Sequence, residues 1–268
     1  MKQRLISSFF GIIILVLVLL GNQQIFDVVV TLISAMAIYE VVCAVGLKEC
    51  KPMIALSALM PAALTIVSYI SQVYIAPTIF LFIALFLMMM LFNHKEYSFS
   101  KVSLFITIST MISLSFLHVI MVRRLGNENL DVLVVLIGSW ITDTCAYFTG
   151  FFLGKHKLAP EISPKKTVEG SIGGILGVIL ILVAYAYAIG NIMNVSVNLV
   201  SAVIIGLVSG IVSQFGDLCA SIIKREHNIK DFGNIMPGHG GVMDRFDSLL
   251  FVAPAVYYIL KFYPIFVR

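Results

Sequence analysis

Apolar segments about as long as a lipid bilayer is thick recur along the whole chain. A transmembrane helix needs about 20 predominantly apolar residues, and about nine segments of the sequence meet that length. They are 1–21, 25–46, 53–73, 75–93, 102–122, 131–153, 171–192, 198–222 and 248–266. Only 12% of the residues are charged and the mean hydropathy is +1.02, whereas a soluble domain carries about twice that fraction of charge. The sequence therefore predicts an all-α, polytopic membrane protein with about nine transmembrane helices.

The distribution of lysine and arginine predicts how these helices are oriented. Loops on the cytoplasmic side of a membrane carry an excess of basic residues. With the N-terminus inside, 14 of the 18 basic residues fall on the cytoplasmic side. They are Lys2, Arg4, Lys48, Lys51, Lys95, Lys101, Lys155, Lys157, Lys165, Lys166, Lys224, Arg225, Lys230 and Arg245. We therefore predict a protein of the cell (inner or plasma) membrane with its N-terminus in the cytoplasm and its C-terminus outside.

The polar residues divide the chain into two predicted regions. Residues 1–130 hold N-terminal transmembrane helices, and residues 131–268 hold a catalytic transmembrane region with two cytoplasmic loops, 154–170 and 224–247. The net charge of +4 is spread over short loops, with no basic helix and no aromatic RNA-binding motif, so we expect no nucleic-acid partner. The four cysteines form no C-x-x-C pair, which argues against a zinc site.

Small residues spaced four apart in two apolar segments predict close helix packing. Gly173 and Gly177 form one such pair, and Gly206 and Gly210 form the other. Pairs of this kind let two helix backbones approach each other in a membrane. They would serve equally well between helices of one chain or in a homodimer, and the sequence leaves both open.

Polar residues follow one face of the segment that ends near residue 226. Gln214, Asp217, Ser221 and Lys224 are spaced three, four and three apart, which places them on the same side of a helix. At about 1.5 Å per residue, Asp217 lies roughly 10 Å deeper than Lys224. A carboxylate at that depth costs a few kcal/mol unless it has a partner. The partner could be a metal cation, or it could be a lysine of a neighbouring helix.

The loop that follows has the composition of a phosphate and metal site. The glycines of the PGHGG turn at 237–241 let backbone N–H groups approach a ligand closely. Asp244 and Asp247 follow three residues apart, so that both carboxylates can face one divalent cation. Hard oxygen ligands of this kind suit Mg²⁺ that bridges to phosphate oxygens. Acidic residues are also common at helix starts without any metal.

A second polar block lies between residues 142 and 174. Asp143 falls inside the sixth apolar segment, and Ser163, Lys165, Lys166 and Thr167 follow in the next loop. Lysines and hydroxyl groups at this density suit a triphosphate, whereas the orientation rule alone would require only the lysines.

One further acid, Glu40, lies within the second apolar segment. A role in helix packing and a role in the site are equally compatible with its position.

Both blocks resemble one enzyme family. The run S-I-I-K-R-x4-K-D-x-G-x3-P-G-H-G-G-V-M-D-R-F-D, from Ser221 to Asp247, resembles the signature of the bacterial phosphatidate cytidylyltransferases, also called CDP-diacylglycerol synthases. The only departure is Met236, where the family usually has Leu, Ile or Phe. The upstream elements D-T-x-A-Y, G-K and S-P-K-K-T-x-E-G match the same family. The resemblance implies a nucleotidyltransferase of phospholipid biosynthesis that transfers the cytidylyl group of CTP to phosphatidate, giving CDP-diacylglycerol and pyrophosphate.

The resemblance also assigns roles to residues. The expected catalytic residues are Asp217, Ser221, Lys224, Arg225, His239, Asp244, Arg245 and Asp247. The expected substrate-binding residues are Ser163, Lys165, Lys166, Thr167, Lys230 and Asp231. The expected metal ligands are Asp217, Asp244, Asp247 and Asp143. Mg²⁺, with room for a second cation, is the expected cofactor, and CTP, phosphatidate and the lipid bilayer are the expected partners.

Two other functions use the same kinds of residue. A CTP-dependent kinase of a polyprenol or another lipid would need a metal and CTP, but it would transfer the γ-phosphoryl group and release CDP. A cation-coupled transporter would use Asp143, Asp217 and Glu40 as an ion path. The polar residues gather on one predicted side of the membrane and do not cross it, which argues against the transporter.

Overall fold

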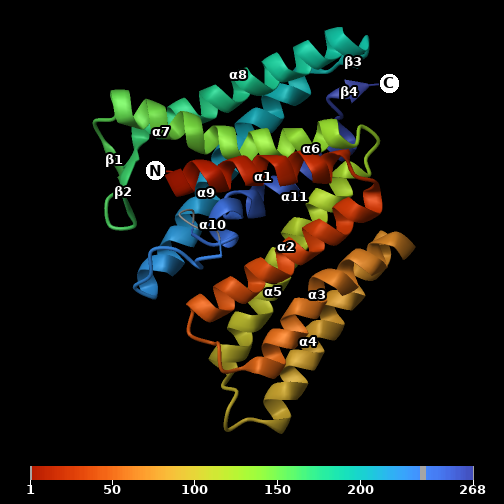
Figure 1. Cartoon of the computed structure of the whole chain (residues 1–268), viewed down its shortest axis with the longest axis vertical. Coiled ribbons are helices and arrows are strands. Elements are labelled where there is room, and N and C mark those ends of the chain that lie inside the picture. The colour runs from red at the N-terminus through yellow and green to blue at the C-terminus, as the bar shows by residue number, and fades with distance from the viewer. Residues whose placement is uncertain (1, 236–239, 268) are drawn as a thin grey trace. The chain divides into compact units, whose positions relative to one another are not determined.

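The structure is a computed structural model that describes residues 2–235 and 240–267, with side chains from residue 11 onward. Most of it is helical (Figure 1). The helices are α1 (Lys2–Leu20), α2 (Gln23–Ala44), α3 (Lys51–Ile70), η1 (Gln72–Tyr74), α4 (Ile75–Phe92), α5 (Phe99–Arg123), α6 (Asn129–Leu136), η2 (Ile137–Ile141), α7 (Thr142–Leu153), α8 (Val168–Met193), α9 (Leu199–Glu226), α10 (Met243–Phe246) and α11 (Leu249–Phe262). The strands are β1 (Lys157–Ala159), β2 (Ser163–Thr167), β3 (Ser196–Val197) and β4 (Phe266–Val267).

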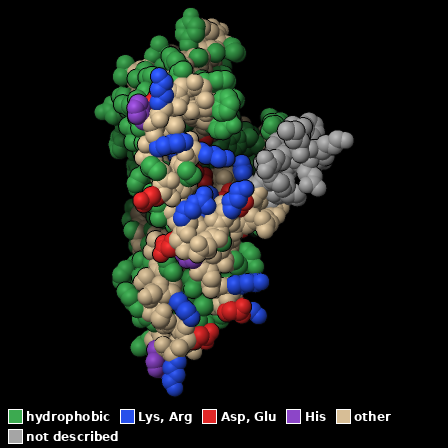
Figure 2. Space-filling view, turned by 90° about the vertical axis from the view of Figure 1, so that its left-hand side faces the viewer, with side chains coloured by type: hydrophobic (Ala, Val, Ile, Leu, Met, Phe, Trp, Pro, Cys, Tyr) green, Lys and Arg blue, Asp and Glu red, His purple; other side chains and the backbone are tan. Residues whose placement is uncertain are grey.

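The all-α, polytopic membrane class is confirmed. Within the described residues, seven helical stretches are long and apolar enough to cross a membrane. Many of their large apolar side chains face outward, such as Phe80, Leu91 and Phe92 on α4, and apolar side chains cover much of the face shown in Figure 2. Outward-facing apolar side chains on long helices are what a hydrocarbon solvent requires. The number of spans and the sides on which the termini lie remain predictions.

The predicted last span, 248–266, is wrong at its end. Helix α11 has only 14 residues and stops at Phe262. Tyr263 precedes Pro264, and a proline disfavours the helical conformation in the residue before it. The chain continues as β4, which pairs antiparallel with β3.

The chain forms two compact units. Unit 1 consists of Met1–Ile120 and His227–Phe246, and unit 2 consists of Met121–Glu226 and Asp247–Arg268. The predicted boundary at residue 130, between the N-terminal helices and the catalytic region, concerns function and not compactness, and it stays a prediction.

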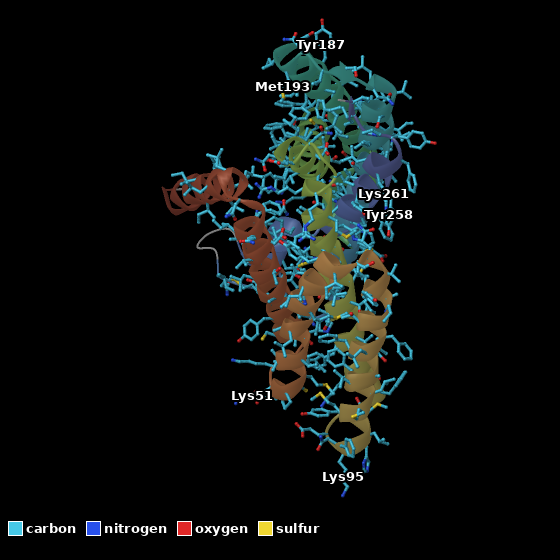
Figure 3. The ribbon with its side chains drawn as sticks, turned by 90° about the vertical axis from the view of Figure 1, so that its right-hand side faces the viewer. Lys51, Lys95, Tyr187, Met193, Tyr258 and Lys261 are labelled. Atoms are coloured by element: carbon cyan, nitrogen blue, oxygen red, sulfur yellow. The ribbon has the colours of Figure 1, made fainter. Side chains whose placement is uncertain are left out.

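In unit 1, α2 packs against α3, α3 packs against α4, and α10 packs against α2. Lys51 and Lys95, which begin and follow the α3–α4 pair, lie at the same end of this unit (Figure 3). That placement agrees with the prediction that their loops lie on one side of the membrane.

A buried acid on α2, Asp27, accepts hydrogen bonds from two side chains of unit 1. They are donated by Gln23 Nε2 at 2.6 Å and by the Tyr69 hydroxyl at 2.5 Å.

In unit 2, α8 packs between α7 and α9, and α9 also packs against α11. The predicted glycine pairs make these contacts. A methyl group at Gly177 would lie 2.5 Å from Cys145 Sγ, and one at Gly206 would lie 2.8 Å from Ile179 Cα. The glycines are therefore used inside the chain, between α8 and its two neighbours, and they give no support to a homodimer.

Two local features were not predicted. The first is a β-hairpin, β1 and β2, within the predicted cytoplasmic loop 154–170. The second is a π-helical turn at Ile137–Ile141 between α6 and α7. Wide turns of this kind often occur at functional sites, and this one directly precedes Asp143.

Candidate active site

Three aspartates come together in unit 2 from different helices. Asp143 lies in the first turn of α7, Asp217 lies near the end of α9, and Asp247 lies just before α11. We call these three the acidic cluster. The carboxylate of Asp143 is repelled by those of Asp217 and Asp247 and attracted by Lys166. A methyl group at Gly216 would lie 2.9 Å from the backbone oxygen of Asp247, so this glycine lets α9 approach the start of α11 closely.

Two lysines neutralise part of the acidic cluster. Lys166, from strand β2, forms an ion pair with Asp217. Lys224, two turns further along α9, has its Nζ 3.7 Å from Oδ2 of Asp247. All four of these side chains are at most about one-quarter exposed, so water screens the charges only in part. Asp217 and Asp247 thus each have an ammonium partner among the described residues.

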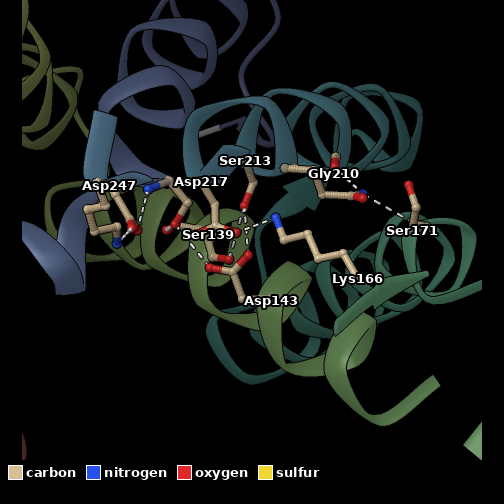
Figure 4. A network of polar contacts seen from close by, with 11 residues as sticks. Ser139, Asp143, Lys166, Ser171, Gly210, Ser213, Asp217 and Asp247 are labelled. Atoms are coloured by element: carbon tan, nitrogen blue, oxygen red, sulfur yellow. Dashed lines mark hydrogen bonds and ion pairs between the residues drawn. The ribbon is translucent and has the colours of Figure 1, made fainter. Parts of the chain in front are cut away.

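Buried serines orient the carboxylates (Figure 4). Ser248 donates from its hydroxyl to Oδ2 of Asp143 at 3.1 Å and from its backbone N–H to Oδ1 of Asp247 at 2.9 Å. Its hydroxyl is also 2.7 Å from the hydroxyl of Ser139 in the π-helical turn. Ser213 on α9 reaches Oδ1 of Asp143 at 3.5 Å. A single serine therefore positions two members of the acidic cluster.

The acidic cluster has the donor chemistry that Mg²⁺ requires. Among the described residues, no group of three or more His, Cys, Asp or Glu side chains has the spacing of a preformed metal cage. Mg²⁺ does not need one, because it usually binds through one or two carboxylates together with water and substrate phosphates. The ammonium group of Lys166 already occupies a position beside Asp217 where a metal cation would bind. The residues present therefore fit a divalent cation that binds together with a phosphate ligand.

The β-hairpin holds four of the six predicted substrate-binding residues, Ser163, Lys165, Lys166 and Thr167, and it places Lys166 at the acidic cluster. Side chains alternate along a strand. Lys166 accordingly points to Asp217, whereas Lys165 is exposed. Thr167 is buried, and its hydroxyl accepts from the Gly170 N–H at 3.1 Å as the N-cap of α8. Ser163 is half-buried at the start of β2.

The hairpin is fastened at two points. Glu169 in the first turn of α8 accepts from the backbone N–H of Lys155 at 3.0 Å, and its Oε1 lies 2.6 Å from Nδ1 of His156. Arg225 at the end of α9 donates from Nε to the backbone oxygen of Ile162 at 3.4 Å. The predicted catalytic residue Arg225 therefore lies at the hairpin. Ser221 is half-buried on α9, one turn from both Asp217 and Lys224.

The remaining predicted residues belong to unit 1. Oδ2 of Asp244 accepts from the backbone N–H groups of Phe232 at 2.8 Å and Gly241 at 3.0 Å. Asp244 therefore ties together the two arms of the loop before α10. Lys230, Asp231 and Arg245 are exposed side chains of this segment, and His239 lies outside the described residues. The structure thus brings together three of the four predicted metal ligands, and the fourth, Asp244, belongs to unit 1.

Several residues that shape the site were not predicted from the sequence. Ser139, Ser213 and Ser248 stand in or beside apolar helices, where a serine usually satisfies its own helix backbone. Only the tertiary contacts reveal that Ser213 and Ser248 hold Asp143 and Asp247, and that Ser139 contacts Ser248.

Comparisons with known proteins show the family to which the chain belongs. The model of a family described as "Cytidylyltransferase family" matches residues 2–263. The chain belongs to the cytidylyltransferase family. It is 32% identical to a phosphatidate cytidylyltransferase of Bacillus subtilis over 98% of both chains. It is also 39% identical to one of Thermotoga maritima over 52% of this chain and 51% of that protein, and 44% identical to one of Staphylococcus aureus over 48% of each.

Membership of the cytidylyltransferase family makes the chain an enzyme of the nucleotidyltransferase class. It favours neither the lipid kinase nor the cation-coupled transporter.

Proposed function

We propose that the chain transfers the cytidylyl group of CTP to phosphatidate, giving CDP-diacylglycerol and pyrophosphate in phospholipid synthesis. The observation that carries the proposal is the acidic cluster with Lys166 and Lys224 held against it, in a membrane chain of the cytidylyltransferase family. The relatives named phosphatidate cytidylyltransferase support the choice of phosphatidate as acceptor.

The reaction joins two anions. A phosphate oxygen of phosphatidate forms a bond to the α-phosphorus of CTP. The bond from that phosphorus to the oxygen bridging to the β-phosphate breaks, and pyrophosphate leaves with the electron pair. The attacking oxygen is already anionic at neutral pH, so no strong general base is needed. Catalysis then depends on alignment and on stabilising negative charge.

The groups proposed to meet that requirement are the two lysines at the acidic cluster and Arg225 at the hairpin. The ammonium groups of Lys166 and Lys224 are near the carboxylates, where they can exchange Asp217 and Asp247 for phosphate oxygens when CTP binds. Arg225 and Ser221 lie on the same helix and add donors for the phosphates of CTP or lipid. Lys165, Ser163, Lys230, Asp231, His239 and Arg245 remain predicted contributors to substrate binding and catalysis.

Mg²⁺ is the proposed cofactor, either alone or with a second cation. Asp217 and Asp247, with Asp143, would hold it in unit 2, and Asp244 stays a predicted ligand. When bound, Mg²⁺ supplies positive charge to the phosphate oxygens of both substrates. Ser248 and Ser213 keep Asp143 oriented, and Ser248 does the same for Asp247.

The location follows from the substrates. Phosphatidate stays in the bilayer because each buried CH₂ group of its chains contributes about 0.8 kcal/mol, whereas CTP is a cytosolic solute. We therefore propose that the site faces the cytoplasm at the surface of the cell membrane, where the hairpin and its lysines are predicted to lie.

The test uses purified protein in detergent with phosphatidate, Mg²⁺ and CTP labelled at the α-phosphate. Label should enter the lipid fraction, and pyrophosphate should be released in equal amount. Transfer of label only from γ-labelled CTP, with release of CDP, would replace the proposal with a lipid kinase.

A further inference from the structure

Glu40 on α2 is a buried acid that the proposed reaction does not use directly. Its side chain is only 3% exposed. Its Oε2 accepts from the backbone N–H of Met243, the first residue of α10, at 2.9 Å. Among the described residues, its Oε1 has no hydrogen-bond partner. A buried carboxylate with an unsatisfied oxygen is costly, so its presence in an apolar helix calls for a compensating role.

Two glycines of the loop before α10 close around this carboxylate. A methyl group at Gly233 would lie 2.5 Å from Glu40 Oε1, and one at Gly241 would lie 2.5 Å from Glu40 Oε2. At both positions the three nearest atoms are all atoms of Glu40. Neither glycine has a positive φ, so close approach to Glu40 is a sufficient reason for the absence of a side chain. We call residues 231–235 and 240–245 the signature loop.

Asp244 ties the same two arms from the other side. It accepts from Phe232, next to Gly233, and from Gly241. Glu40 and Asp244 therefore hold the same loop from two sides. Asp244 belongs to the loop itself, and Glu40 belongs to a helix about two hundred residues earlier in the chain. Because all of these residues lie in unit 1, the contact is internal to that unit.

We propose that Glu40 is a positioning residue that fixes the signature loop, and with it Asp244 and Arg245, to helix α2. The proposal rests on the proposed function, because that function gives the loop its purpose. Without the carboxylate, the Met243 N–H loses its acceptor, and the two glycines lose the surface against which they pack. The signature loop should then open more often, and the residues it carries should spend less time in their working positions.

The test measures backbone hydrogen–deuterium exchange of the signature loop in the purified full-length protein. In Glu40→Ala, exchange should rise about tenfold or more, as expected when a hydrogen bond to a charged acceptor is lost. Glu40→Gln keeps an amide oxygen that can accept from Met243, and it should recover most of the protection. The matched control is Asp27→Asn, which alters another buried acid of α2 whose partners include Gln23 and Tyr69. This control should leave the signature loop unchanged.

The glycines provide a second test from the loop side. Gly233→Ala should raise exchange in the signature loop, because its methyl group collides with Glu40. The same substitution should have little further effect in Glu40→Ala, where the collision partner is gone. Such non-additivity is the mark of a direct contact. If Glu40→Ala does not fold, Gly241→Ala displaces the carboxylate from the Met243 N–H and should raise exchange in the same way.

Two results would overturn the proposal: exchange within twofold of the wild type in Glu40→Ala or Gly241→Ala, or an equal rise in Asp27→Asn. The exchange measurement needs no turnover, so it is independent of the reaction. If the wild type transfers no cytidylyl group, the proposed function fails and exchange still decides the role of Glu40. If transfer is normal in the wild type and exchange is unchanged in Glu40→Ala, only the role of Glu40 fails.

Discussion

Replacing Lys166 by methionine removes the ammonium group from Asp217 while keeping a side chain of similar length. The two side chains are 24% and 26% exposed, between a surface ion pair, worth about 0.2–1 kcal/mol, and a buried one, whose disruption costs about 3–5 kcal/mol. We therefore expect the substitution to lower the free energy of unfolding by about 1–3 kcal/mol. The acidic cluster also loses one positive charge.

The loss of Lys166 should raise the apparent KM for CTP more than the loss of an exposed lysine does. If Lys166 exchanges Asp217 for a phosphate oxygen, its loss removes a charge-assisted hydrogen bond worth about 1.5–3 kcal/mol. The apparent KM for CTP should then rise about 10- to 150-fold. The neighbouring residue provides a graded comparison, because Lys165 is also a predicted substrate-binding residue and lies on the same strand, but its side chain is exposed. Lys165→Met should change KM by about fivefold at most, since exposed charges contribute about 1 kcal/mol or less.

The assay is initial-rate formation of labelled lipid at varied CTP and fixed, saturating phosphatidate and Mg²⁺. Thermal unfolding of both variants in detergent separates lost stability from lost binding. The reasoning would be refuted if Lys165→Met raised the KM for CTP as much as Lys166→Met, or if Lys166→Met left it unchanged.

Three other predictions follow from the same contacts. Asp217→Asn and Asp244→Asn should both lower turnover at limiting Mg²⁺, and near-normal turnover in both would remove the metal assignment. Thr167→Ala should lower the free energy of unfolding by about 1 kcal/mol through loss of the α8 N-cap, while Thr167→Ser, which keeps the hydroxyl, should not; equal thermal midpoints of the two variants would exclude the cap. Gly206→Ala should cost about 1–3 kcal/mol because its methyl group would lie 2.8 Å from a backbone atom of α8, and an unchanged midpoint would mean that α8 and α9 can separate freely.

The helices of this chain could be predicted because their length and composition leave few alternatives in a membrane. Runs of about 20 apolar residues must satisfy their own backbone groups, and helices do so. The η1 turn ending at Tyr74, which divides α3 from α4, agrees with the predicted break there. The predicted last span extends past the end of α11 because the apolar run continues through Pro264, whereas the helix ends at Phe262, before the proline.

The β-hairpin and the π-helical turn could not be predicted in the same way. Strand β2 reads Ser-Pro-Lys-Lys-Thr, which has no alternation of apolar and polar residues. Its pairing depends on β1 and on the contacts of Glu169 with Lys155 and His156. The π-helical turn lies in an apolar run whose residues are compatible with any helical period.

The acids and lysines of the site could be predicted by type, but their pairing could not. Lys165 and Lys166 are equivalent in sequence, and only the strand geometry separates the lysine that contacts Asp217 from the one that is exposed. The sequence also left the role of Glu40 open, because its partners lie about two hundred residues away.

The most direct test of the central claim is phosphorus NMR of a single reaction that contains purified protein, phosphatidate, CTP and Mg²⁺ in detergent micelles. The spectrum separates phosphomonoester, pyrophosphate, CDP and the pyrophosphate diester of CDP-diacylglycerol. Cytidylyl transfer predicts that the diester and pyrophosphate signals grow equally as CTP and phosphatidate disappear, and that Lys166→Met slows both together. Growth of CDP without pyrophosphate, or consumption of CTP without any diester, would contradict the account.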